Sequence, residues 1–373
     1  MNPEKIIVFG GSFDPIHNSH ITLCKNSLKE VGADKLILVP SKNPRWKIPT
    51  ETIEDRLNMI NLCLKDYGLD YEIEDCEIKS WKEVDYTIET IEHLKKKHPN
   101  AKLYLLIGAD QVNKFDRWRE AEKIAEATQI IYYPRPGYII NEKLVSRYNM
   151  IKISGNLVDT SSTKIRALNS LDTSISVINY IIENKLYFMD KIDNYLSGRR
   201  LEHSISVANL AFKVATSNNL PFPGTYYLTG LIHDIGKNIA KEEQRDYIEK
   251  YYRYYTDIPE YAYHQFVGSA IALKEFGITD KTILKAIKYH CTGNKEMSDL
   301  GKVIYACDKI EPTRGYDSSD LIESMLNNYE SGFIKVLEEN MKFISSRTND
   351  HNPYTDELTQ ICASYYLYGL DYR

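Results

Sequence analysis

The chain has 373 residues, of which 43% are apolar and 27% charged, and it carries a net charge of −5. This composition excludes wholesale disorder, and the mild acidity argues against a surface that coats nucleic acid. No apolar run approaches the about 18 residues of a membrane span, and the length favours two domains over one. Six scattered cysteines with no Cys-x-x-Cys pair predict free thiols and a cytoplasmic location.

The first half alternates short apolar runs with helical patterns. Strands are predicted over residues 5–10, 35–40, 71–74, 102–108 and 129–133, and helices over 19–31, 54–65 and 87–97. Near-continuous apolar strands separated by helices are typical of a parallel sheet covered on both faces, so we expect a Rossmann-like α/β domain. Ligands of such sheets bind beyond the carboxyl ends of the strands, which Gly10, Pro40 and Gly108 mark.

The second half has an almost entirely helical pattern. Helices are predicted over residues 201–217, 226–235, 241–255, 267–276, 281–289, 300–309 and 321–343. We therefore expect an all-α second domain. The pattern changes near residues 188–195, which places the two domains at residues 1–189 and 190–373.

A glycine pair and two histidines follow the first predicted strand. Gly10 and Gly11 let backbone N–H groups approach an anion, and the helix that follows adds a favourable dipole. His17 and His20 are three residues apart, so at the start of a helix both rings lie on one face. This pattern favours a phosphate site whose two donors stabilise growing charge on a phosphoryl group. Two surface histidines or a metal pair are the alternatives.

Several motifs give this half a resemblance to the nucleotidyltransferase superfamily, and within it to bacterial nicotinate-nucleotide adenylyltransferases. The resemblance covers about residues 4–188 and rests on six motifs in register: Gly10–His20, Val39-Pro40-Ser41 with Lys47 and Arg56, Asp85-Tyr86-Thr87, Gly108-Ala109-Asp110 with Trp118, Arg135-Pro136-Gly137-Tyr138, and Ser161–Arg166. It implies that a mononucleotide phosphate attacks the α-phosphorus of ATP, with Mg²⁺ accompanying the ATP, and that pyrophosphate leaves.

The resemblance also implies roles for individual residues. His17 and His20 would contact the ATP phosphates, while Lys47 and Arg166 neutralise the pyrophosphate. Ser162 and Thr163 would donate to phosphate oxygens, and Asp110 would hold ribose or a magnesium-linked water. Trp118 would stack on the pyridine ring and, with Tyr86 and Thr87, recognise its carboxylate. The other expected substrate contacts are Gly10, Gly11, Ser12, Phe13, Gly108 and Arg135.

Two points stay open in this half. Ser19 occupies the position of the glycine in the family's histidine–any–glycine–histidine motif, which leaves the affinity for ATP in doubt. Trp118 also fits a core aromatic residue. Nicotinamide mononucleotide or phosphopantetheine are alternative substrates, although the tyrosine–threonine pair and Trp118 favour nicotinate mononucleotide.

Histidines and aspartates cluster in the second half. An aspartate beside a histidine in the apolar run Leu231–Ile235 is costly to bury unless it is paired or binds a metal. Histidines from other helices could complete a binuclear site with open water positions. Any one of these histidines alone would more often be structural. The candidate ligands are His203, His233, Asp234, His264, His290 and Asp308.

This half resembles the HD phosphohydrolase superfamily, and in particular the bacterial symmetrical diadenosine tetraphosphate hydrolases. The match covers about residues 192–345 and implies that His203, His233, Asp234 and Asp308 bind one metal ion. His264 and His290 would bind a second ion and share Asp234. Iron is the family's favoured metal and manganese the alternative. Three further residues are candidates for gripping the phosphates of a dinucleoside polyphosphate: Lys237, Thr292 and Arg314.

The sequence thus predicts a bifunctional enzyme without a nucleic-acid or membrane partner, and it leaves a homo-oligomer open. Its substrates would be ATP, nicotinate mononucleotide and a dinucleoside polyphosphate such as diadenosine tetraphosphate. In one alternative, the HD domain hydrolyses another nucleotide. In another, one domain only senses a nucleotide and regulates the other.

Overall fold

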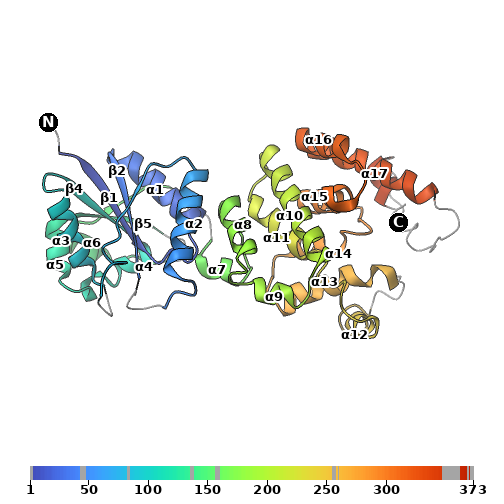
Figure 1. Cartoon of the computed structure of the whole chain (residues 1–373), viewed down its shortest axis with the longest axis horizontal. Helices are drawn as coiled ribbons and strands as arrows, with labels where there is room; N and C mark the ends of the chain where they lie inside the picture. Colours follow the sequence, from blue (N-terminus) through green and yellow to red (C-terminus); the bar gives the residue numbers. More distant parts are fainter. Residues whose placement is uncertain are drawn as a thin grey trace. The chain divides into compact units, whose positions relative to one another are not determined.

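The computed structural model describes residues 3–42, 48–81, 85–134, 138–155, 160–253, 258, 260–346, 362–367 and 369. The chain forms two compact units, coloured along the sequence in Figure 1. The first comprises Met1–Arg166 and Thr173–Tyr187, and the second comprises Ala167–Asp172 and Phe188–Arg373. The sequence of Ala167–Asp172 does not predict that this short segment belongs to the second unit.

A six-stranded, fully parallel sheet forms the centre of the first unit, with the strand order β3-β2-β1-β4-β5-β6. The order reverses between β1 and β4, so the carboxyl ends of these two strands border the crevice in which such sheets bind ligands. The expected parallel α/β architecture is confirmed. The strands are β1 (Lys5–Gly11), β2 (Lys35–Pro40), β3 (Glu72–Ile73), β4 (Lys102–Gly108), β5 (Gln129–Tyr133) and β6 (Ile151–Lys152).

Helices cover both faces of this sheet (Figure 1). Apolar side chains of α3 and α5 join those of one sheet face in a single buried cluster, while α1 contacts β1 and β2 and α2 contacts β2. The helices of this unit are α1 (Asn18–Val31), α2 (Ile53–Asp66), α3 (Thr87–Lys97), α4 (Ala109–Val112), α5 (Ala121–Ala127), α6 (Glu142–Arg147), α7 (Ser162–Arg166) and α8 (Ile175–Glu183), with a 3-10 turn, η1, at Phe115–Arg117.

The described part of the second unit is helical, as expected. Helix α15 lies at its centre and packs against α10, α11, α14 and α17. The helices are α9 (Met189–Asp193), α10 (Arg199–Ser217), α11 (Pro223–Ile232), α12 (Lys241–Tyr251), α13 (Tyr263–Lys274), α14 (Lys281–Lys288), α15 (Asp299–Ile310), α16 (Ser319–Asn327) and α17 (Tyr329–Ser346), with 3-10 turns η2 (Glu260–Ala262) and η3 (Pro312–Arg314).

The single helix predicted over residues 321–343 is two helices. Asn328 interrupts them with an extended backbone at φ −157° and ψ 111°. The side chain of Asn218 stabilises the break, because it donates to the carbonyl oxygen of Met325 and accepts from the backbone N–H of Tyr329. This contact joins segments more than 100 residues apart, so the local pattern contains no sign of it.

None of the helices in the described ranges combines the length and the apolar character needed to cross a bilayer.

Candidate active sites

A pair of histidines lies where β1 ends and α1 begins. His17 is the N-cap residue of α1 and His20 stands in its first turn, and their rings stack with centroids 3.7 Å apart. The backbone N–H of His17 donates to Nδ1 of His20 over 3.2 Å, so a neutral His20 carries its proton on Nε2. A Cβ on Gly11 would lie 3.1 Å from the ring of Phe13, which packs edge-on against His20. The loop therefore places two imidazoles at the ligand-binding edge of the sheet.

Buried charged side chains hold this loop. Asp14 is fully buried, and its carboxylate accepts from the backbone N–H of Thr50 over 2.8 Å and from the hydroxyl of Tyr187 over 2.9 Å. The buried Arg56 donates to the carbonyl oxygen of Ser12. Neither Asp14 nor Tyr187 was predicted from the sequence to have a role. Asp14 lies inside the glycine–histidine motif, whereas the contact of Tyr187 spans 173 residues and leaves no local signal.

Helix α7 brings three predicted residues against the same loop. The Ser162 hydroxyl donates to the carbonyl oxygen of Pro15 over 2.9 Å, and Arg166 donates to that of Asp14. The Arg166 guanidinium also donates to Thr163 Oγ1 over 3.2 Å and lies 3.6 Å from the Asp14 carboxylate. The Arg166 side chain remains 17% exposed. Its positive charge therefore lies beside the loop that carries the two histidines, at a position that an anion can reach.

The remaining predicted contacts of this half lie around β4 and α3. A Cβ on Gly108 would lie 2.7 Å from Oδ1 of Asp110, so the absent side chain lets this carboxylate fold back over the strand end. Tyr86 is the N-cap residue of α3, which begins at Thr87. Trp118 is partly buried and, like Tyr86, packs against the core cluster of this unit. One part of the indole thus serves the core while another part stays accessible.

Two predicted residues, Lys47 and Arg135, lie outside the described residues. Ser19 lies in the first turn of α1 and is 5% exposed, and Gly10 ends β1 together with Gly11.

The second candidate site collects side chains from five segments of the second unit. His203 lies on α10, His233 and Asp234 follow α11, His264 lies on α13, His290 follows α14, and Asp308 lies on α15. Two groups have potential ligand atoms within 4.8 Å of one another: His203, His233 and Asp308, and His233, Asp234 and His290. His264 Nε2 lies 3.6 Å from Asp234 Oδ1. All six predicted ligands therefore lie together, with His233 common to the two groups and Asp234 facing both His264 and His290.

Each of the four histidines is oriented by a hydrogen bond from Nδ1. Three donate to the backbone carbonyl three residues earlier, over 2.6–2.8 Å, and His203 donates to Glu311 Oε1 over 2.8 Å. Every ring thus turns Nε2 toward Asp234 or Asp308, at 3.2–3.6 Å. In a neutral ring that carries its proton on Nδ1, Nε2 is a hydrogen-bond acceptor, and here it faces a carboxylate oxygen that is also an acceptor. The buried Nε2 of His233 has no hydrogen-bond partner among the described residues. A cation between them would satisfy both, so the residues fit a metal pair.

The pKa shifts of two histidines and two aspartates agree with this assignment, whereas at His203 the carboxylates of Asp308 and Glu311 outweigh burial and raise the pKa. Burial lowers the pKa of His264 to about 3 and also lowers the pKa of His290. Burial works to raise the pKa of Asp234, but the positive charge nearby, Lys237 included, outweighs it and holds that pKa well below its usual range. The pKa of Asp308 is held low in the same way. Neutral imidazoles and ionised carboxylates are the forms that bind metal.

These side chains open into a cavity of about 920 Å³ whose lining includes five cationic side chains and four carboxylates, among them those of Asp234 and Asp308. Lys237 Nζ lies 3.2 Å from His264 Nε2, and Arg314 donates to the backbone carbonyl and the carboxylate of Asp308. The cationic residues that line the cavity are Arg199, Arg200, Lys237, Lys309 and Arg314. The wall is suited to a substrate with several phosphates.

Thr292 occupies a different place from the other two predicted phosphate contacts. It is 2% exposed, and its hydroxyl accepts from Gln265 Nε2 over 3.1 Å and donates to the carbonyl oxygen of Gly293. It is not one of the residues that line the cavity in the described part of the unit. Its contacts stabilise the turn that follows His290.

Glu311 is a functional candidate that the sequence analysis missed. It is 1% exposed, and besides the His203 ring its carboxylate accepts from the backbone N–H and the hydroxyl of Thr313. It therefore fixes the orientation of a candidate ligand 108 residues away. The only available signal was its position one helical turn after Asp308.

A glycine allows the helices around this site to approach closely. A Cβ on Gly236 would lie 2.2 Å from the carbonyl oxygen of His264 and 2.7 Å from the backbone nitrogen of Gly268. The segment that carries His233 and Asp234 thus contacts the backbone of α13 directly. Any larger residue would separate His264 from Asp234.

Comparison with known proteins follows this division. A cytidylyltransferase-like family model matches residues 8–168, and an HD domain model matches residues 200–313. Fold and sites together define a nucleotidyltransferase unit joined to an HD unit.

Relatives extend over most of the chain. A Mycoplasma genitalium protein named probable nicotinate-nucleotide adenylyltransferase/Ap4A hydrolase is 28% identical over 90% of this chain and 97% of its own length. A probable nicotinate-nucleotide adenylyltransferase from Borrelia garinii subsp. bavariensis is 35% identical over 49% of this chain and 94% of its own. A solved HD superfamily hydrolase of Clostridium acetobutylicum is 24% identical over 48% of this chain and 97% of its own, with a TM-score of 0.42. The chain belongs to the nicotinate-nucleotide adenylyltransferase family and carries an additional HD domain.

Proposed function

We propose that the first unit transfers an adenylyl group from ATP to nicotinate mononucleotide. An oxygen of the mononucleotide 5′-phosphate attacks the α-phosphorus of ATP, the bond from that phosphorus to the β-phosphate oxygen breaks, and pyrophosphate leaves. The products are nicotinate adenine dinucleotide and pyrophosphate. The observation that carries this proposal is the stacked His17–His20 pair at the carboxyl end of β1, beside Arg166.

The residues of this unit act by positioning and by charge. The Nε2–H of His20 would donate to a phosphate oxygen, and Arg166 with Lys47 would stabilise the charge on the departing pyrophosphate. Mg²⁺ enters with ATP as part of the substrate. Trp118 would stack on the pyridine ring, and the groups around Tyr86 and Thr87 would recognise its carboxylate. No covalent enzyme intermediate is required.

A substrate panel tests this proposal. The full chain is incubated with Mg²⁺-ATP and, in parallel, nicotinate mononucleotide, nicotinamide mononucleotide or phosphopantetheine, and pyrophosphate release is followed with product mass. We expect the highest kcat/KM with nicotinate mononucleotide. Product with a competitor and none with nicotinate mononucleotide would contradict the assignment. ATP binding without any pyrophosphate would favour a sensor.

We further propose that the HD unit hydrolyses a dinucleoside polyphosphate such as diadenosine tetraphosphate. A water oxygen attacks a phosphorus in the middle of the chain, the bond to its bridging oxygen breaks, and two ADP molecules form. A pair of divalent cations, iron or manganese, would polarise the phosphate and supply an activated water when bound. The six ligand residues would hold these ions, while Lys237 and Arg314 bind phosphate oxygens. The five cationic side chains that line the cavity of about 920 Å³ support a long substrate with several phosphates.

A nucleotide panel tests the second proposal. Protein loaded with Fe²⁺ or Mn²⁺ under low oxygen is given diadenosine tetraphosphate, ADP, ATP and a dinucleoside diphosphate. We expect ADP as the product of diadenosine tetraphosphate, at a rate that a chelator abolishes. Faster hydrolysis of another nucleotide would replace the substrate and keep the reaction class.

A further inference from the structure

Lys309 lines the cavity of the HD unit but has no role in the proposed hydrolysis. It follows Asp308 on α15, and its side chain is only 15% exposed. Its ammonium group lies 3.8 Å from the centroid of the Tyr305 ring, which is fully buried. A lysine held this far inside a helical unit must have its charge compensated by the groups around it.

The ammonium group has polar partners on two separate segments. Nζ donates to the backbone carbonyl oxygens of His290 over 3.2 Å and of Cys291 over 3.3 Å. It also lies 3.6 Å from Oδ2 of Asp308. The three N–H bonds thus have two carbonyl oxygens, one carboxylate oxygen and an aromatic face within reach. This environment leaves little donor capacity for a phosphate.

These partners belong to both candidate metal groups. His290 is a member of one group and Asp308 of the other. Oδ1 of Asp308 faces His203, His233 and Arg314, while Oδ2 faces Lys309, so the guanidinium and ammonium groups together hold the carboxylate with Oδ1 toward the histidines. A single cation therefore spans the two groups.

The contact of Lys309 with the backbone of His290 also constrains the position of the His290 ring. His290 follows α14, and its Nδ1 donates over 2.8 Å to the carbonyl oxygen of Ile287, so the ring is fixed relative to its own backbone. Lys309 anchors that backbone through the carbonyl oxygen of the same residue. A displacement of this turn would move Nε2 of His290 away from Asp234, which lies 3.4 Å from it.

We propose that Lys309 is a positioning residue that fixes the spacing between the two metal groups by tying the His290 turn to Asp308. The inference rests on the proposed metal pair of the HD unit, and not on the identity of its substrate. It differs from the roles assigned to Lys237 and Arg314, because Lys309 acts through two candidate ligands.

Metal binding provides the test. The full chain is stripped with a chelator, and Mn²⁺ binding is measured by calorimetric titration for wild type, Lys309→Met and Lys309→Arg. We expect the methionine variant to bind at least one Mn²⁺ about tenfold or more weakly, as is usual when a group that orients a ligand is lost. Lys309→Arg retains the positive charge and the hydrogen-bond donors, so the Mn²⁺ affinity of this variant should stay within about threefold of that of the wild type.

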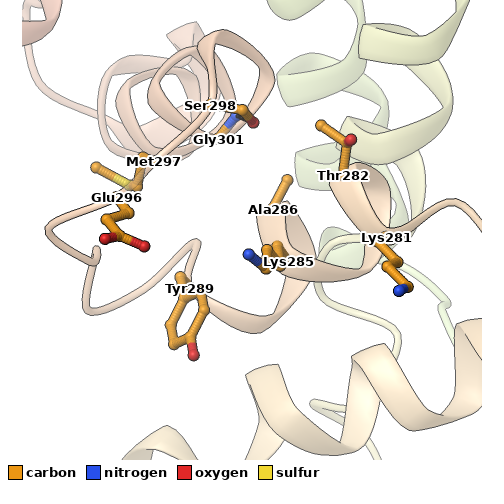
Figure 2. A pocket seen from close by; sticks show the side chains of 9 residues that line it. All are labelled: Lys281, Thr282, Lys285, Ala286, Tyr289, Glu296, Met297, Ser298 and Gly301. Carbon is orange, nitrogen blue, oxygen red and sulfur yellow. Dashed lines mark hydrogen bonds between the residues drawn. The ribbon is translucent and has the colours of Figure 1, made fainter.

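Lys285 offers a matched control. It lies on α14, the helix that leads to His290, and lines a separate pocket of about 220 Å³ that contains none of the six candidate ligands (Figure 2). In Figure 2 it stands with Tyr289 on one side of that pocket, across from Glu296 and Met297. Lys285→Met removes an exposed lysine from the same neighbourhood and should bind Mn²⁺ as the wild type does.

The outcomes separate this inference from the proposed reaction. Wild-type Mn²⁺ affinity in folded Lys309→Met overturns the inference, and a raised KM with that result would make Lys309 a phosphate contact instead. Should circular dichroism show that Lys309→Met does not fold, Lys309→Gln replaces it under the same tenfold criterion. A wild-type chain that binds Mn²⁺ but hydrolyses no nucleotide contradicts the proposed reaction alone. A wild-type chain that binds no divalent ion overturns both.

Discussion

At the scale of single residues, each site depends on groups that orient the residues of the motif. His20 has its tautomer set by the backbone of His17, and His203 is turned by Glu311. Glu311 is not itself a candidate ligand, so its loss should weaken the HD site without removing any of the direct ligands.

Glu311→Ala tests this at the HD site. The substitution removes the acceptor for Nδ1 of His203, so the ring loses both its orientation and part of its basicity. We expect metal affinity to fall by about 10–100-fold, the range observed for such outer partners. Calorimetric titration with Mn²⁺ measures the loss.

Glu339→Ala on α17 is the control for this change. Glu339 is exposed, pairs with Lys342 and is not one of the residues that line the cavity in the described part of the unit, so its removal should leave Mn²⁺ binding unchanged. Equal affinities for the Glu311 and Glu339 variants would show that His203 needs no such partner.

At the scale of elements, close backbone packing brings His264 to Asp234. The segment that carries His233 and Asp234 contacts α13 at Gly236 and Gly268, where neither residue has a side chain to separate the two backbones. Few other arrangements would let two helical segments present their ligands to one ion.

Gly236→Ala should disrupt that contact. Because the new Cβ would meet backbone atoms of α13 at 2.2 Å, the segments must separate, at a cost of about 1–3 kcal/mol in the free energy of unfolding. We expect lost Mn²⁺ binding and retained adenylyl transfer. Thermal unfolding and both activity assays check this outcome.

Gly301→Ala serves as its control. This glycine lies in the first turn of α15, and a Cβ there would meet no backbone of another segment, only the side chains of Met297 at 3.3 Å and Ser298 at 3.6 Å among its three nearest atoms. Alanine in a helix interior is favoured over glycine by about 0.5–1 kcal/mol, so the variant should be as stable as the wild type or more so. If both glycine variants behaved alike, close packing at Gly236 would not matter for the site.

Elements with a strong local signal were predictable. The bounds of β2, β4, β5 and α3 agree with the pattern to the residue, because buried strands leave unbroken apolar runs and α3 has a clear apolar stripe. The strand β6 was missed because its two residues are exposed and lack any apolar pattern. The break at Asn328 was missed because the residue that stabilises it, Asn218, is distant in sequence.

The sites were predictable to a similar degree. Motif residues such as His17, His20 and the six candidate metal ligands could be named from the chain, since their chemistry is carried by residue type and spacing. Thr292 belongs to the same sequence motif as His290, yet its hydroxyl points into a buried hydrogen-bond network. Tyr187, Glu311 and Lys309 act through contacts that only the folded chain creates.

At the scale of the whole molecule, the chain combines two anion-binding sites of different chemistry. One offers imidazole and guanidinium groups at the edge of a parallel sheet, and the other offers clustered histidines and carboxylates among helices. Each site is built entirely from residues of its own unit. The two activities should therefore be separable by single substitutions.

The most direct measurement is a pair of activity assays on wild type, His20→Ala and Asp234→Ala, with metal content determined by elemental analysis. His20→Ala should abolish dinucleotide synthesis, keep its metal and keep hydrolysis at the wild-type rate. Asp234→Ala should lose its metal and hydrolysis and retain synthesis. The account is contradicted if either substitution abolishes both activities in a protein that circular dichroism shows to be folded.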